Sequence, residues 1–140
     1  MPQASTAISA TPMAITGSKL AFVTGGFPEH TLHSSVSITN EGLVHVAVTR
    51  DRLTGEKRIY INGVLDAEGM GSTELLDSAD GLEIGYNNGT GFKGVMDDIQ
   101  IYSGVLSPAE IAFLYANPWS TVPDAGGSEL GEAVDAPELM

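Results

Sequence analysis

The sequence contains no cysteine and has few basic or aromatic side chains. Without cysteine there is no disulfide, no thiolate metal site and no cysteine nucleophile, and the redox compartment is left open. Only 6 Lys and Arg stand against 18 Asp and Glu, a net charge of -12. Because this field repels phosphates and anionic headgroups, we expect neither nucleic acid nor a membrane surface as a partner.

Long apolar runs are also missing near the start. Residues 1–14 have no basic stretch followed by an apolar segment, so they predict neither a signal peptide nor a membrane anchor, and an export signal would lie outside this sequence. A chain of 140 residues predicts one domain. Glycine makes up 17 residues while charged residues reach only 17%. This balance favours strands joined by glycine turns.

Alternating aliphatic residues mark the centre of the chain. Residues 43–51 place Val44, Val46 and Val48 on one face, and residues 56–61 alternate again after a short connection containing glycine. Asn62-Gly63 follows at once, and this pair suits a type I′ turn. We predict a three-stranded antiparallel meander over residues 43–67.

The second half predicts further strands. Residues 82–86 alternate, and residues 92–102 form the longest expected strand. Within that strand Asp97 shares a face with Val95, Ile99 and Ile101, so its carboxylate needs a partner. Weaker strand signals lie before residue 43, over residues 7–15, 20–24 and 31–38. Seven to nine short strands indicate an all-β antiparallel sandwich or jelly roll.

One short helix is expected near the end. Ser107-Pro108-Ala109-Glu110 has the form of a capping box with proline at the first helical position. Ile111, Leu114 and Tyr115 supply an apolar stripe, and Asn117-Pro118 ends the helix. We expect Trp119 to cover the edge of the core. The remaining residues turn to Pro, Gly, Ser and acids, which is typical of a linker.

These motifs together resemble the laminin G-like, concanavalin A-like lectin and glucanase domains. The runs that carry the resemblance are His45 to Asp51, Thr54-Gly55-Glu56, Tyr60 to Gly63, Leu82 to Gly85, Phe92 to Tyr102 and Val105 to Ile111. The resemblance covers residues 17–116. It implies a concanavalin A-like β-sandwich over residues 17–118, with an N-terminal extension or extra strand at 1–16 and an acidic linker or tail at 119–140.

Two departures from the family pattern stand out. Leu43 and Val44 replace the tryptophan and histidine that usually open the central strand, and the family's opening strands have no counterpart before residue 17. A sandwich without these strands exposes unpaired amides and an apolar face. Three explanations stay open: residues 4–15 fill the gap within the chain, identical chains exchange strands to give a dimer or filament, or the sequence is a piece of a longer protein.

We predict no catalysis. Glycosidases of this superfamily use a Glu-x-Asp-x-x-Glu triplet whose acting carboxylates lie about 5 Å apart, and the sequence has none. Asp97 and Asp98 are adjacent and would face opposite sides of a strand. There is no Gly-x-Ser-x-Gly motif either, and the three histidines are scattered.

Calcium is the one cofactor that the resemblance suggests. It would place Asp97 or Asp98 near the ion, and carboxylate oxygens suit this cation. The alternative is that Asp97 accepts backbone amides as a structural anchor. His30 and His33 would project to opposite faces of a strand, so we do not expect them to chelate together.

Sugar binding requires an aromatic platform beside planar hydrogen-bonding groups. The candidates flank two loops and are Phe27, His30, Tyr86, Asn87, Asn88 and Phe92. The ordinary explanation is that Tyr86 and Phe92 alternate as core residues and that Asn87-Asn88-Gly89 is turn chemistry. The resemblance implies a secreted, non-catalytic recognition module, part of a larger protein, that binds a carbohydrate or cell-surface glycan. The alternative is a self-assembly protein completed by strands of a neighbouring copy.

Overall fold

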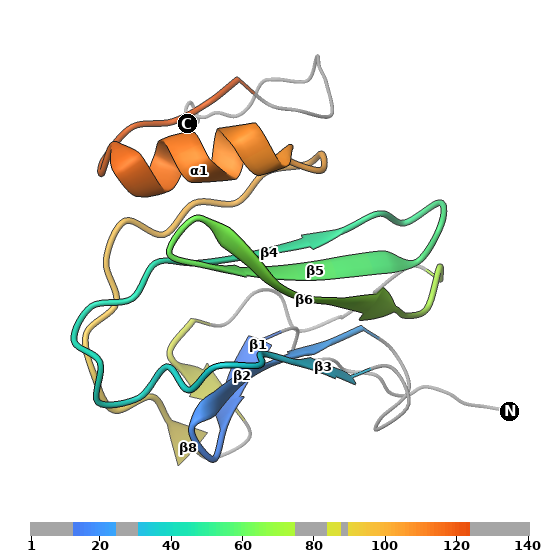
Figure 1. Ribbon diagram of the computed structural model, residues 1–140. Helices are drawn as coiled ribbons and strands as arrows, with labels where there is room; N and C mark the ends of the chain where they lie inside the picture. The colour runs from blue at the N-terminus through green and yellow to red at the C-terminus, as the bar shows by residue number, and fades with distance from the viewer. Residues whose placement is uncertain (1–12, 25–30, 75–83, 88–89, 124–140) are drawn as a thin grey trace, which may run out of the picture.

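The computed structural model describes residues 13–24, 31–74, 84–87 and 90–123. Helix α1 (Pro108–Ala116) lies over the sheet of β4, β5 and β6, and the sheet of β1, β2 and β3 lies on the other side of it (Figure 1). All strand pairs are antiparallel. The predicted β-sandwich with one short helix is therefore confirmed.

The outer sheet has the order β1-β2-β3. Its strands are β1 (Met13–Thr16), β2 (Lys19–Val23) and β3 (Thr31–His33). A two-residue turn joins the first two strands, and Gly17 adopts a φ of 65° there, which glycine tolerates without cost. Leu20 and Phe22 are buried on the face toward the middle sheet. Residues at the end of the predicted N-terminal extension thus belong to a strand of the domain.

The middle sheet has the order β4-β5-β6. Its strands are β4 (Val46–Arg50), β5 (Glu56–Ile61) and β6 (Val64–Met70), so the predicted meander is confirmed. Asn62 and Gly63 have φ values of 51° and 80°, as a type I′ turn requires. The pairing skips one residue, because Ile59 faces Ala67 while Tyr60 faces Leu65. The skipped residue forms a β-bulge in β6.

The bulged residue ties the middle sheet to the chain after β3. This residue is Asp66. Its carboxylate oxygen accepts a hydrogen bond from the Ser35 amide, and its carbonyl oxygen accepts one from Ser35 Oγ at 3.1 Å. A bulge leaves its extra residue outside the ladder. Here the freed groups of Asp66 join two layers of the domain.

Strand β5 contributes to two separate cores. Ile59 packs with Leu20 and Phe22 of the outer sheet. On the opposite face, Tyr60 packs in a cluster completed by Leu106, Ile111 and Leu114. Because successive strand residues point to opposite faces, one strand can serve both cores. The middle sheet is therefore covered on each side.

Helix α1 begins with the predicted capping box. Ser107 Oγ accepts from the Glu110 amide at 3.1 Å, and Glu110 Oε1 accepts from the Ser107 amide at 2.8 Å. The helix spans nine residues. Within the described part of the chain, no helix has the length and apolar character of a membrane span.

Two expectations for the second half are wrong. Residues 92–102 do not form a strand, because no described edge pairs with them beyond the short hairpin of β7 (Tyr86–Asn87) and β8 (Thr90–Gly91). Alternation of aliphatic residues gives a strand only when a neighbouring edge supplies hydrogen bonds. Trp119 does not cover the core either, since 68% of its surface is exposed.

Candidate functional site

Strand β4 lies at one edge of the middle sheet. It pairs with β5 on one side, and none of the described strands pairs with its other side. Ala47 of this strand packs against the Tyr60 cluster, and Tyr102 packs against the same cluster from the later segment. The end of the segment 92–105 and strand β4 therefore share this core cluster.

The segment 92–105 is extended, and the side chains that it exposes are unusually apolar. Its large exposed hydrophobic residues, in chain order, are Phe92, Val95, Met96, Ile99, Ile101 and Val105. Val95 is 73% exposed and Ile101 is 69% exposed. Scattered apolar residues are common on protein surfaces, but a continuous run of this kind marks an interaction site or a face that lacks its cover.

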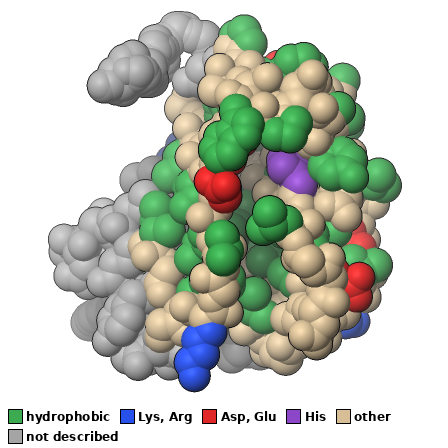
Figure 2. Space-filling view, turned by 90° about the vertical axis from the view of Figure 1, so that its left-hand side faces the viewer, with side chains coloured by type: hydrophobic (Ala, Val, Ile, Leu, Met, Phe, Trp, Pro, Cys, Tyr) green, Lys and Arg blue, Asp and Glu red, His purple; other side chains and the backbone are tan. Residues whose placement is uncertain are grey.

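This segment runs along one side of the molecule in Figure 1, in yellow to orange, and Figure 2 shows that side face on. Hydrophobic side chains gather there around a hollow, with a histidine and an acidic side chain at its rim. We call the surface formed by β4 and residues 92–105 the open face.

A polar network surrounds Asp98, in the middle of the segment 92–105. Its two carboxylate oxygens accept from Gln100 Nε2 at 2.9 Å and from the Trp119 amide at 3.1 Å. Gln100 Nε2 also donates to the Ser120 carbonyl at 2.8 Å, and Gln100 Oε1 accepts from Tyr102 at 2.8 Å. The network holds the chain after α1 against residues 98–102.

The calcium candidates Asp97 and Asp98 lie in this region. Asp97 Oδ1 accepts from the Asp98 amide at 3.0 Å, so it takes a local backbone contact. Calcium takes about 6 to 8 oxygen ligands. Among the described residues no three acidic, histidine or cysteine side chains converge to hold a metal. The described groups supply only part of such a shell, and calcium binding stays a prediction.

His45 lies at the boundary between β4 and the helix. Its ring lies 5.8 Å from the ring of Tyr115, and its Nδ1 atom is buried without a hydrogen-bond partner. Burial lowers the pKa of His45, while the negative charge of Asp98 acts in the opposite direction. The ring of His45 thus lies against Tyr115 of α1, next to the start of β4.

The predicted sugar-binding residues are only partly covered by the structure. Phe27, His30 and Asn88 lie outside the described residues, and Tyr86 and Asn87 belong to β7, where the backbone alone is described. Phe92 is partly exposed, and its amide donates to the Gly85 carbonyl at 2.7 Å. A shared binding role for this group stays a prediction.

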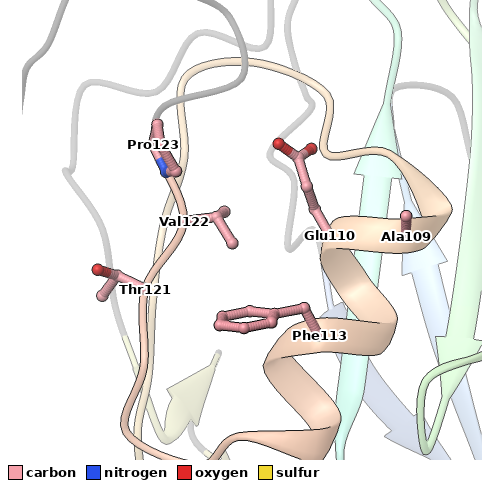
Figure 3. Close-up of a pocket in the computed structure, with 6 residues that line it drawn as sticks. All are labelled: Ala109, Glu110, Phe113, Thr121, Val122 and Pro123. Carbon is pink, nitrogen blue, oxygen red and sulfur yellow. The ribbon is translucent and has the colours of Figure 1, made fainter.

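A second depression lies between α1 and the chain that follows it (Figure 3). Its lining residues are Ala109, Glu110, Phe113, Thr121, Val122 and Pro123. Phe113 and Val122 face each other across it. Its only charged group is Glu110, whose carboxylate already completes the capping box. The groove therefore offers apolar contact and little chemistry.

Sequence reasoning missed the network of Asp98, Gln100 and Trp119 as a unit. The sequence pattern gives no reason to single out Gln100, and it predicts that Trp119 covers the core edge. One signal was available, because the only tryptophan of the chain follows the helix stop at Asn117-Pro118. A large aromatic residue placed beyond the last helical turn has few neighbours to bury it.

Residues 12–112 match a laminin G family described as the concanavalin A-like lectin/glucanases superfamily. The chain belongs to this superfamily. The match ends within α1, so Trp119 lies beyond it. No curated protein matches the chain.

A crystal structure of an S-layer domain-containing protein from Clostridium thermocellum ATCC 27405, residues 221–444, is similar to this domain. The two share 26% sequence identity and align with a TM-score of 0.50 over 69% of this chain. The chain spans half the length of that structure. The superfamily and this neighbour together fit a non-catalytic extracellular module.

Proposed function

We propose that the chain is a non-catalytic extracellular assembly module whose middle sheet is completed by a strand from a second copy. One observation carries the proposal. Aliphatic side chains at Val95, Ile99 and Ile101 are exposed on a segment that has strand-like alternation and no described strand partner. Strand β4 has an open edge, and it packs against the same core cluster as Tyr102 at the end of that segment.

One added strand would supply two things that the open face lacks. The edge of β4 presents backbone N–H and C=O groups that an incoming strand can pair. The side chains of Val95, Ile99 and Ile101 would lose contact with water, and each buried aliphatic side chain stabilises by roughly 1.5–3 kcal/mol. A strand between β4 and residues 92–102 would supply both contributions.

The donor that we propose is the N-terminal segment, residues 4–12, of the second copy. This segment is rich in Ala, Ser and Thr with one isoleucine, Ile8, and no charged residue occurs before Lys19. An uncharged strand suits an apolar acceptor because it buries no unpaired charge. It also adds no repulsion to a chain whose net charge is -12.

The S-layer neighbour supports an assembly role, because its name places it among proteins with S-layer domains. Strand exchange between identical chains closes into a dimer when the exchange is mutual. It gives an open filament when each chain donates to the next one. Both products have the same local contact between the donor strand and the open face.

The absence of native cysteine allows a direct experiment. Two single variants, Ile8→Cys and Ile101→Cys, are purified separately, mixed, partly unfolded and refolded together, and then oxidised. We expect a disulfide-linked heterodimer on non-reducing gels, because only a strand from another copy brings the two thiols together. The matched control replaces Ile101→Cys with Leu53→Cys, since Leu53 is exposed at 87% outside the open face.

Light scattering after size-exclusion chromatography gives an independent reading. The proposal expects a dimer or larger species that persists on dilution, and a lower mass for the Ile101→Lys variant. A monodisperse monomer would overturn it. A double variant, Ile8→Cys with Ile101→Cys, that closes a disulfide within one chain would show completion in cis and would also reject assembly.

A further inference from the structure

The layer between the two sheets is closed along one side. There, Leu32 of β3 lies against β6, and the hydrogen bonds between Ser35, which follows β3, and Asp66 of β6 join the same two edges. In the middle of the layer, Lys57 of β5 donates to the Phe22 carbonyl of β2. Because β3 lies over β6 and β2 lies over β5, the strand order places β1 level with β4 at the opposite side.

Two side chains of β1 point into this layer and stay half exposed. Met13 pairs with Phe22 and Ile15 pairs with Leu20, and residues directly opposite each other on antiparallel strands share a face. Leu20 and Phe22 are 4% and 5% exposed, whereas Met13 and Ile15 are 45% and 42% exposed. The inner face of the outer sheet is therefore covered at β2 and uncovered at β1.

Strand β4 is uncovered on its inner face in the same way. Val46 and Val48 pack against the buried cluster between the sheets, but both are only partly buried. We call the apolar margin formed by Met13, Ile15, Val46 and Val48 the side slot. Each of its two strands lies at the edge of its sheet and pairs with only one described strand. An apolar margin beside an open edge leaves a position for one more strand.

We infer that the side slot receives Ile8 of a second copy, and that Met13 and Ile15 of the acceptor copy are specificity-determining residues for the incoming strand. The inference rests on the proposed strand exchange and adds the outer sheet to the acceptor. A strand paired with β4 lies about 4.8 Å beyond it and turns alternate side chains toward the outer sheet. Met13 and Ile15 point into the same layer, so these inward side chains meet them.

The donor segment has one large side chain to place in the side slot. Thr6, Ile8 and Ala10 share a face of an extended strand, so that face carries a single aliphatic side chain between two smaller ones. The four side chains that line the slot are larger and apolar, and large residues pack well opposite a row of mostly small ones. A polar residue at position 8 would be left without a hydrogen-bond partner between the sheets.

The exposure of Met13 can be followed in the unmodified protein, because peroxide oxidises exposed thioethers to sulfoxides. The full-length protein is treated with hydrogen peroxide below and above the concentration at which light scattering detects association, and mass spectrometry of its peptides measures each sulfoxide. We expect Met13 to be oxidised roughly fivefold more slowly, or slower still, in the associated protein. Met70 is the internal control, because it is 64% exposed at the end of β6.

A double-mutant cycle tests the contact between Ile8 and Ile15. Each single variant, Ile8→Ala or Ile15→Ala, is expected to weaken association roughly tenfold, the loss for one buried aliphatic contact. The double variant should be weakened by much less than the product of the two losses, because both changes remove the same contact. Val36→Ala is the matched control, since Val36 is 46% exposed next to Ser35 on the closed side. Circular dichroism checks that each variant is folded.

The results separate the side slot from the strand exchange on which it rests. A protein that does not associate at any concentration would reject both. Association with equal oxidation of Met13 in the dilute and associated protein, or with additive losses for Ile8→Ala and Ile15→Ala, would overturn the side slot alone. In that case the crosslink between positions 8 and 101 would still support strand exchange.

Discussion

The ammonium group of Lys57 in β5 lies 3.1 Å from the carbonyl oxygen of Phe22 in β2 and 5.3 Å from the centre of its ring. Lys57 is 1% exposed, so this contact joins the two sheets within the core. Burial, with a further contribution from the positive charge of Arg50, lowers the pKa of Lys57 to about 8. The lysine is therefore a hydrogen-bonded but costly link between the layers.

The stability of the domain should rise with pH above the pKa of Lys57. Between about pH 8 and 10.5 the unfolded chain keeps a proton that the folded chain has released, so the free energy of unfolding increases with pH. Between pH 7 and 9.5, we expect the unfolding free energy of the native protein to increase by about 2 kcal/mol more than that of the Lys57→Met variant. Urea unfolding at several pH values measures this difference, and parallel profiles would contradict it.

Truncation of the buried Ile59 and of the exposed Ile101 should have different effects on stability. Ile59 is completely buried, and Ile59→Ala is expected to lower the unfolding free energy by about 2–5 kcal/mol at any protein concentration. Ile101→Ala should cost about 0.5 kcal/mol or less in dilute protein, because the side chain is exposed. Its cost should grow with concentration as association buries it. Equal effects at high and low concentration would argue against strand exchange.

The capping box makes a separate contribution to stability. Ser107→Ala removes the acceptor for the Glu110 amide and is expected to cost about 1 kcal/mol in thermal or urea unfolding. Glu110→Gln is the matched control, because glutamine can still reach back to the Ser107 amide. A loss for the glutamine variant as large as that for the alanine variant would show that the charge of Glu110, rather than the hydrogen bonds, stabilises this end of the helix.

The features that were predicted correctly depend on a few consecutive residues. The Asn62-Gly63 turn and the Ser107 capping box need only local backbone preferences. Residues 92–102 carry a strand pattern, but a strand also needs an edge to pair with, which one segment cannot specify. The exposure of Trp119 depends on a contact with Asp98, 21 residues earlier, and no periodicity in the sequence reports it.

The position of the middle sheet between the outer sheet and α1 limits how copies can add to one another (Figure 1). Both faces of β5 are already covered, so the sheet can extend only sideways, in the direction of its hydrogen bonds. A polymer built through the open face would keep the thickness of one domain while its length increased. Under the proposed strand exchange, we therefore expect ribbons of constant thickness rather than stacked aggregates that thicken.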